Sequence, residues 1–210
     1  MPQQFYLRFP LLLIGLMLMA FGVVLSIRSD LGTSPISSLP YVYSFIVPLS
    51  VGVLTIAMHI VMIILQKLLL GNKFTWTRYL QLPIGIIFSL GIDVLLWLTQ
   101  NWQADNYIQQ LLYCLSSCMI TAIGVCMLVK ANLVFFFCVG LYQAFALRFN
   151  WNFGSCKSFG AMVLVLLAVI SSYIGLHYIV GIREGTIISA LLVGFLVKQM
   201  LPRLAFIQFK

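Results

Sequence analysis

Long apolar segments alternate with short polar breaks along the whole chain. Such a segment must run for about 20 residues to cross a bilayer as a helix. Since the segments repeat from one end of the chain to the other, the pattern predicts an all-α polytopic membrane protein. Eight segments can be marked, namely 9–27, 36–50, 51–66, 79–98, 107–129, 133–147, 158–178 and 185–201.

Two of these segments are too short to cross a bilayer as straight helices. Segments 36–50 and 133–147 each give roughly 22 Å of helix against a hydrocarbon core of about 30 Å. Pro35, Pro40 and Pro48 punctuate the first of them. Interrupted backbone at membrane depth is tolerated only where protein surrounds it or where it lines a cavity. We therefore expect about six transmembrane helices plus two short or re-entrant helices.

The two halves of the chain carry a similar stretch of sequence. FGVVLSIRSDL at 21–31 returns as IGVCMLVKANL at 123–133, and each copy places a basic and a polar residue before a final Leu. The pattern predicts two repeat halves, 1–102 and 103–210, within one membrane domain. Repeated membrane segments in transporters commonly enclose the substrate pathway between them.

The distribution of Lys and Arg favours one arrangement of these halves. If both short segments enter and leave on the same side, only Arg28 and Arg183 of the 12 basic residues lie on the opposite side. Because cytoplasmic loops are enriched in Lys and Arg, this asymmetry predicts cytoplasmic termini and inverted halves. Eight full spans would divide the charges evenly and make the repeats parallel, and this alternative stays open.

Composition excludes a water-soluble protein and argues against an enzyme. Apolar residues make up 62% of the chain, charged residues 8%, and the mean hydropathy is +1.09; such a chain cannot cover a water-facing surface. The net charge of +8 comes from basic residues scattered at segment ends, which indicates topology rather than nucleic-acid binding. The five cysteines show no metal-ligand spacing, and no catalytic triad or phosphate loop is found. We expect no enzymatic activity, no cofactor and no metal.

The stretch RSDLGTSP at 28–35 combines the end of one helix with the start of the next. Gly32 is suited to a helix end, and Ser34 with the proline after it is typical of a helix start. The free N–H groups of that start, together with Arg28, would hold a carboxylate or sulfonate. The alternative is that Arg28 marks the membrane interface and pairs with Asp30. The solute-binding residues predicted here are Arg28, Asp30, Gly32, Thr33 and Ser34.

Polar residues in other segments complete the predicted site. Asp93 interrupts the segment 79–98, and a charge at the centre of a span costs about 2.5 to 3.5 kcal/mol, so its side chain should face the protein interior. It would bind a coupling proton or cation, or pair with Arg28. His59 is a second coupling candidate because imidazole titrates near neutral pH, although a lone intramembrane His more commonly hydrogen-bonds across a helix interface. Lys130, Asn132 and Gln143 are the solute-binding residues predicted in the second half.

Two motifs resemble a family of bacterial integral membrane proteins. IRSDLGTSP at 27–35 and EGTIISALLVG at 184–194 are similar to patterns of the YitT/YczE family. The second half departs from that family, since KANLVFFFCVG at 130–140 lacks the Gly and Pro usual in its loop. The resemblance implies a multi-span protein of the bacterial inner membrane, with solute transport as an inference, and it names no ligand.

Together these features predict a permease for a small anionic or zwitterionic solute, with alternating access between two halves that meet at a polar cavity. The alternatives are a substrate-binding membrane subunit of a larger transporter and a non-transporting accessory or regulatory protein. The expected partners are the lipid bilayer and a small-molecule solute, not nucleic acid. Six short spans make a thin wall around a pathway, which favours a homodimer. The expected location is the bacterial inner (cytoplasmic) membrane.

Overall fold

The computed structural model describes residues 2–133 and 136–203, and these residues form α-helices and short 3₁₀ helices without strands. Each predicted apolar segment corresponds to one α-helix, so the all-α fold is confirmed. The elements are α1 (Pro2–Arg28), α2 (Pro35–Ile46), α3 (Val51–Leu70), η1 (Gly71–Lys73), η2 (Trp76–Leu80), α4 (Gln81–Leu98), α5 (Tyr107–Ala131), α6 (Phe137–Phe149), α7 (Phe153–Leu176) and α8 (Glu184–Arg203).

Six helices in the described ranges are long and apolar enough to cross a membrane, as expected of a multi-pass membrane protein. They are α1, α3, α4 with the turn before it, α5, α7 and α8. The other two, α2 and α6, have only 12 and 13 residues. The predicted set of about six long helices and two short ones is therefore confirmed, while the re-entrant path of the short helices stays a prediction.

The first short helix is continuous, contrary to the expectation that its prolines interrupt it. Helix α2 begins at Pro35 and contains Pro40. The N–H group at the first helical position has no acceptor within the helix, so a proline there loses no hydrogen bond. Pro40 lacks the N–H that would donate to the turn before it, so the helix loses one backbone hydrogen bond there. The helix ends at Ile46, before Pro48.

The helices form two compact units, and each unit combines segments from both halves of the chain. Unit 1 comprises Met1–Ser34, Leu90–Leu133 and Gly181–Lys210, and unit 2 comprises Pro35–Ser89 and Val134–Val180. The boundary therefore falls within α4. Because the units are discontinuous in sequence, they differ from the halves 1–102 and 103–210, which stay a prediction.

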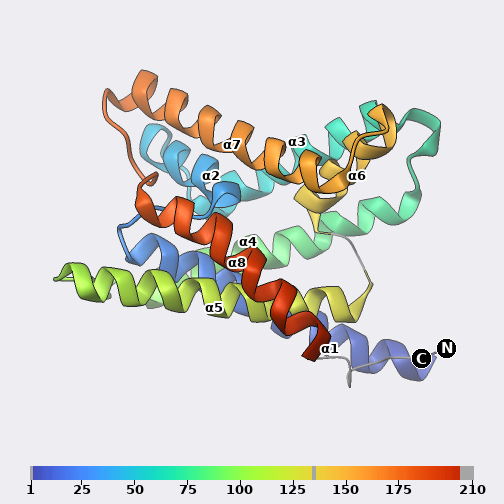
Figure 1. Cartoon of the computed structure of the whole chain (residues 1–210), viewed down its shortest axis with the longest axis horizontal. Helices are drawn as coiled ribbons and strands as arrows, with labels where there is room; N and C mark the ends of the chain where they lie inside the picture. Colours follow the sequence, from blue (N-terminus) through green and yellow to red (C-terminus); the bar gives the residue numbers. More distant parts are fainter. Residues whose placement is uncertain (1, 134–135, 204–210) are drawn as a thin grey trace. The chain divides into compact units, whose positions relative to one another are not determined.

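In unit 1, α1 and α5 lie side by side and run in opposite directions (Figure 1). A Cβ atom added to Gly15 would lie 3.0 Å from the carbonyl oxygen of Gly124, and one added to Gly22 would lie 3.0 Å from that of Ser117. Small residues at such positions allow helix backbones to approach closely. Inverted halves require that their first helices run antiparallel. Parallel halves would make the same two helices run in the same direction.

In unit 2, each short helix packs against a long helix from the other half of the chain. Helix α2 contacts α7, and α6 contacts α3 (Figure 1). A Cβ atom on Gly175 of α7 would lie 2.7 Å from Ile46 Cδ1 of α2, and Cys138 Sγ of α6 lies 3.5 Å from Met62 Sδ of α3. Exchanging the two halves exchanges these pairs, as expected of a repeat. A buried core cluster comprises Met62, Phe137, Cys138, Leu141, Tyr142, Cys156 and Leu164.

Corresponding helix ends recur at the sequence offset of the predicted repeat. Asp30 after α1 and Asn132 after α5 both have positive φ angles, of 54° and 46°. Asp and Asn adopt this left-handed conformation more readily than most residues. Ser50 and Asn152 cap α3 and α7, and the side-chain oxygen of each accepts a backbone N–H from the first turn. These correspondences favour a duplicated chain, and the duplication stays a prediction.

Candidate functional site

The stretch after α1 packs against the start of α8 within unit 1. Gly32 has a φ of 105°, and a Cβ atom there would lie 2.6 Å from both Arg183 N and Thr186 Oγ1. The backbone N–H of Thr33 donates to the carbonyl oxygen of Gly181 at 2.9 Å. Protein atoms therefore fill the space beside Gly32 and Thr33, and these two residues hold the connection in place.

Arg28 and Asp30 have separate partners among the described residues. Arg28 ends α1 and donates from Nη2 to Leu96 O at 2.8 Å and from Nε to Thr99 Oγ1 at 3.3 Å. Both acceptors lie at the C-terminal end of α4, where carbonyl groups lack helical donors. Asp30 is exposed, and its carboxylate lies 3.9 Å from Arg183 Nη1. Arg28 thus joins α1 to α4.

The remaining predicted residues of unit 1 lie at several different elements. Ser34 is partly buried just before α2, and Asp93 is partly buried in the second half of α4. Lys130 is partly buried in the last turn of α5, and Asn132 is its exposed C-cap.

A polar cluster lies in unit 2, where α3, α6 and the start of α4 meet. Gln66 is fully buried, and its Nε2 donates to Gln81 Oε1 and to Phe137 O, both at 3.2 Å. Arg78 donates from Nη1 to Gln66 Oε1 at 3.1 Å and from Nη2 to Gln143 Oε1 at 3.4 Å. We call Gln66, Arg78, Gln81 and Gln143 the Arg78 cluster. Of the predicted site residues, Gln143 belongs to it.

Gly140 of α6 provides the space that the Arg78 cluster needs. A Cβ atom there would lie 2.8 Å from Gln66 Oε1 and 3.0 Å from Gln81 Nε2. Its carbonyl oxygen also accepts from Arg78 Nη1 at 3.3 Å. Any side chain at this position would displace one of the two buried amides.

The Arg78 cluster contains one full charge and no acidic partner. The described acceptors of the guanidinium are two amide oxygens and one backbone carbonyl. Partly buried charges are normally compensated by opposite charges. Unit 2 supplies none, because the chain has four acidic residues and all belong to unit 1: Asp30, Asp93, Asp105 and Glu184. The cluster therefore suits a negative group brought by a ligand.

His59 lies two turns before Gln66 on the same face of α3. The side chain is 2% exposed, and its ring stacks on Phe137 with centroids 3.5 Å apart. Within the described part of the chain, neither ring nitrogen has a hydrogen-bond partner, and the buried hydroxyl of Ser89 has none. A Cβ atom on Gly85 of α4 would lie 3.0 Å from His59 Nδ1. Buried polar atoms without partners are uncommon and mark places for a ligand, ion or water. Polar groups therefore extend along α3 from Gln66 of the Arg78 cluster to His59.

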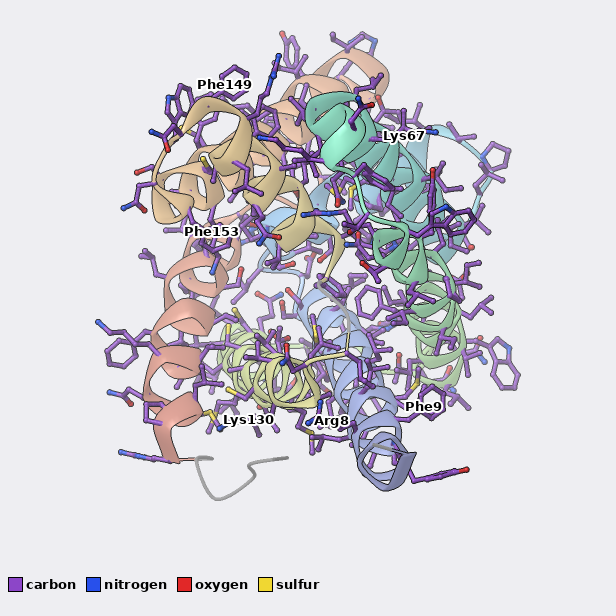
Figure 2. The ribbon with its side chains drawn as sticks, turned by 90° about the vertical axis from the view of Figure 1, so that its right-hand side faces the viewer. Arg8, Phe9, Lys67, Lys130, Phe149 and Phe153 are labelled. Carbon is purple, nitrogen blue, oxygen red and sulfur yellow. The ribbon has the colours of Figure 1, made fainter. Side chains whose placement is uncertain are left out.

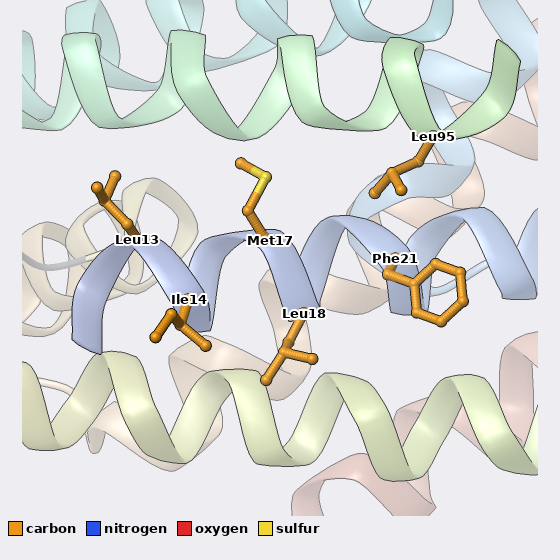
Figure 3. Close-up of a pocket in the computed structure, with 6 residues that line it drawn as sticks. All are labelled: Leu13, Ile14, Met17, Leu18, Phe21 and Leu95. Atoms are coloured by element: carbon orange, nitrogen blue, oxygen red, sulfur yellow. The ribbon is translucent and has the colours of Figure 1, made fainter. Parts of the chain in front are cut away.

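A groove on unit 1 has an entirely apolar lining (Figure 3). It has a volume of about 530 Å³ and is formed by five residues of α1 and one of α4. A pocket for a polar solute needs a few polar groups that fix the ligand's orientation. This groove is therefore suited to hydrocarbon and is not the predicted polar cavity. Its lining residues are Leu13, Ile14, Met17, Leu18, Phe21 and Leu95.

The chain matches one known protein family over most of its length. Residues 6–202 match the family of unknown function DUF6198. The chain belongs to this family. Neither the curated proteins nor the solved structures contain a significant match to it. The DUF6198 match makes no connection to YitT/YczE, so that resemblance stays a prediction.

Sequence reasoning missed Gln66 and Arg78 as site residues. Both stand near the ends of apolar segments, where polar residues are common in any membrane protein. One signal was available in the sequence, since 31–92 and 106–183 contain no acidic residue. Arg78 is 15 residues from the nearest acidic residue, Asp93, whereas Arg28 is two residues from Asp30.

Proposed function

We propose that the chain is a membrane permease for a small anionic or zwitterionic solute, and that the Arg78 cluster binds the solute's negative group. The observation that carries the proposal is the partly buried Arg78 guanidinium, whose described acceptors are all neutral, in a unit without acidic residues. A guanidinium binds a carboxylate, phosphate or sulfonate through two parallel, charge-assisted hydrogen bonds.

Gln143 would exchange partners when the solute binds. In the observed arrangement, its amide oxygen accepts from Arg78 Nη2. An amide also carries two donors, so rotation of the Gln143 side chain would turn its NH₂ group toward the bound anion. The solute's negative group would then replace the Gln143 oxygen at Arg78, while Gln66 keeps its donor bonds to Gln81 Oε1 and Phe137 O.

His59 and Ser89 would form the next polar position for the solute or for a coupling proton. Two helical turns separate His59 from Gln66, which is about 10 Å along α3. The side chains of His59 and Ser89 are buried, and their polar atoms have no hydrogen-bond partner among the described residues. A solute that leaves Arg78 would therefore meet further hydrogen-bonding groups instead of an apolar wall.

Alternating access remains the proposed mechanism, and the two units offer two bodies for it. The antiparallel α1 and α5, together with the cross-half pairs α2·α7 and α3·α6, favour the inverted halves that recur in secondary transporters. The proposed setting is the bacterial inner membrane, with both termini cytoplasmic and the protein a homodimer.

The first test is a thermal-shift screen of the purified protein with small carboxylates, phosphates, sulfonates and amino acids. A ligand at 100 times its Kd stabilises the folded state by about 2.7 kcal/mol. We expect one solute class to stabilise the wild type and Arg28→Gln, and to have no effect on Arg78→Gln. Arg28 is the matched control because it is also a partly buried arginine bound to oxygen acceptors. The reverse result would return the anion site to the connection after α1.

Uptake into proteoliposomes then separates a permease from its alternatives. The solute identified by thermal shift should accumulate with the chain as the sole protein. Binding without uptake would favour a substrate-binding subunit of a larger transporter. If no solute stabilises the protein, an accessory or regulatory role is the better explanation.

A further inference from the structure

One end of unit 2 carries four exposed cations from four elements, α3, η1, α6 and α7. Lys67 lies in the last turn of α3, Lys73 ends η1, Arg148 lies in the last turn of α6, and Lys157 follows the first turn of α7. We call these four residues the basic end of unit 2. They are distinct from Arg78, which is partly buried and has protein acceptors.

The packing of α3 against α6 places these residues at the same end of the unit. His59 contacts Phe137, and Gln66, two turns later, also lies beside Gly140 of α6. The two helices therefore run in the same direction and end together, as Figure 1 shows. Only three residues separate the end of α6 from the start of α7, and η1 follows α3 directly. All four cations thus share one end.

Two exposed tryptophans, Trp76 and Trp151, follow Lys73 and Arg148 by three residues each. Trp76 is 84% exposed and Trp151 is 57% exposed. The ring of Phe149 lies 5.6 Å from that of Trp151 between centroids. Figure 2 labels Lys67 at the upper right, Phe149 at the upper left and Phe153 below it. Trp side chains are enriched at the level of lipid headgroups, where one part of the ring meets hydrocarbon and the N–H meets water.

We propose that the basic end of unit 2 binds the headgroups of anionic phospholipids. Its cations have no carboxylate within their own unit, so a phosphodiester is the complementary charge. Each Lys or Arg near an anionic bilayer surface adds about fivefold in affinity. A free anion would account for the cations alone, whereas a lipid accounts for the cations and the exposed aromatic rings together. The inference is independent of the proposed solute site.

Tryptophan fluorescence provides a local readout of this contact. The chain has four Trp residues, and Trp97 and Trp102 belong to unit 1. Replacing them as Trp97→Phe and Trp102→Phe leaves Trp76 and Trp151, both beside the basic end. This protein is reconstituted in vesicles that contain brominated phosphatidylglycerol or brominated phosphatidylcholine at the same fraction. We expect the brominated phosphatidylglycerol to quench more strongly, with a lipid preference of at least fivefold, the contribution of a single cation.

Charge variants in the same background decide whether the basic end causes the preference. The fourfold variant Lys67→Gln, Lys73→Gln, Arg148→Gln and Lys157→Gln should quench equally with both lipids. The pair Lys67→Gln and Lys157→Gln should show an intermediate preference, which keeps the test available if the fourfold variant does not fold. Lys198→Gln with Arg203→Gln is the matched control, because both are exposed cations of α8 in unit 1, and it should keep the full preference.

Three results would overturn the inference. Equal quenching by the two lipids in the starting protein would show that the basic end has no preference for anionic headgroups. A preference that survives in both charge variants would place its cause elsewhere. A preference that inorganic phosphate abolishes, and that sodium chloride of the same ionic strength does not, would reassign the basic end to a free anion.

Discussion

Unit 1 and unit 2 neutralise their basic residues in different ways. In unit 1, Arg183 has the carboxylates of Asp30 and Glu184 at 3.9 and 3.3 Å. In unit 2, Arg78 has amide and backbone oxygens as acceptors, and no acidic residue occurs anywhere in that unit. Unit 1 carries its own negative charge, whereas unit 2 can accept a negative charge from outside.

The two units also differ in what they bury. Unit 1 brings α1 and α5 together through glycines with backbone-to-backbone contact at Gly15 and Gly124. Unit 2 buries a network of glutamines, and His59 and Ser89 beside it have unpartnered polar atoms among the described residues. Close packing favours a rigid support, and unpartnered buried groups favour a binding region. We therefore propose a supporting role for unit 1 and solute binding for unit 2.

The largest effect is expected from filling the contact between α1 and α5. A Cβ atom on Gly124 would lie 2.7 Å from Gly15 O and 2.9 Å from Met19 N. These are backbone atoms, which cannot rotate away as the end of a flexible side chain can. Gly124→Leu should lower the free energy of unfolding by about 3 kcal/mol or more, measured by thermal denaturation in detergent. Gly194→Leu is the control because no atom of the described residues lies within 4 Å of a Cβ atom there. Equal losses in both variants would contradict the supporting role of this contact.

The helices could be predicted from sequence because a membrane span must stay apolar over its whole length. The expected segment 107–129 and the observed helix Tyr107–Ala131 differ only at the C-terminal end. The error at Pro40 arose because a proline was treated as a break, although a helix tolerates the loss of one hydrogen bond when tertiary contacts support it. Apolar length is a local property, and local properties are visible in sequence.

The Arg78 cluster could not be predicted in the same way, because it depends on contacts between distant residues. Arg78 and Gln143 are 65 residues apart, and their hydrogen bond depends on which faces of α3, α4 and α6 meet. A glycine and a proline follow Arg28 closely, which is typical of a binding loop, yet those residues serve the connection to α8 and α2. Gln143 was predicted, but its partner was not.

Gln143→Glu tests the comparison by giving unit 2 the acid that it lacks. Its Oε1 already accepts from Arg78, and a charge-assisted hydrogen bond there should raise the free energy of unfolding by about 2 kcal/mol. The new carboxylate should also occupy the anion site, so stabilisation by anionic solutes should disappear. Thermal shifts with and without solute measure both effects. Gln199→Glu on exposed α8 should change neither; unchanged solute binding in Gln143→Glu would place the anion site elsewhere.

Two variants on one face of α3 should shift stability in opposite directions. Gln66→Leu removes one of the three described acceptors of Arg78 and the side-chain donor to Phe137 O, and it should cost about 2 kcal/mol. His59→Leu removes two buried nitrogens that have no described partner and should raise stability by about 1 kcal/mol. Chemical denaturation of both proteins measures the difference. If His59→Leu is destabilised as much as Gln66→Leu, His59 serves packing and not solute binding or coupling.

The smallest effect on the response to solute is expected at Arg28, where the loss should concern the stability of unit 1 alone. Arg28→Gln removes the hydrogen bonds to Leu96 O and Thr99 Oγ1, and one side-chain hydrogen bond contributes about 1 kcal/mol to stability. Thermal denaturation should show this loss, while the increase caused by an anionic solute should equal that of the wild type. A variant that folds normally but no longer responds to the solute would show that unit 1 takes part in binding, and the division of roles between the two units would then fail.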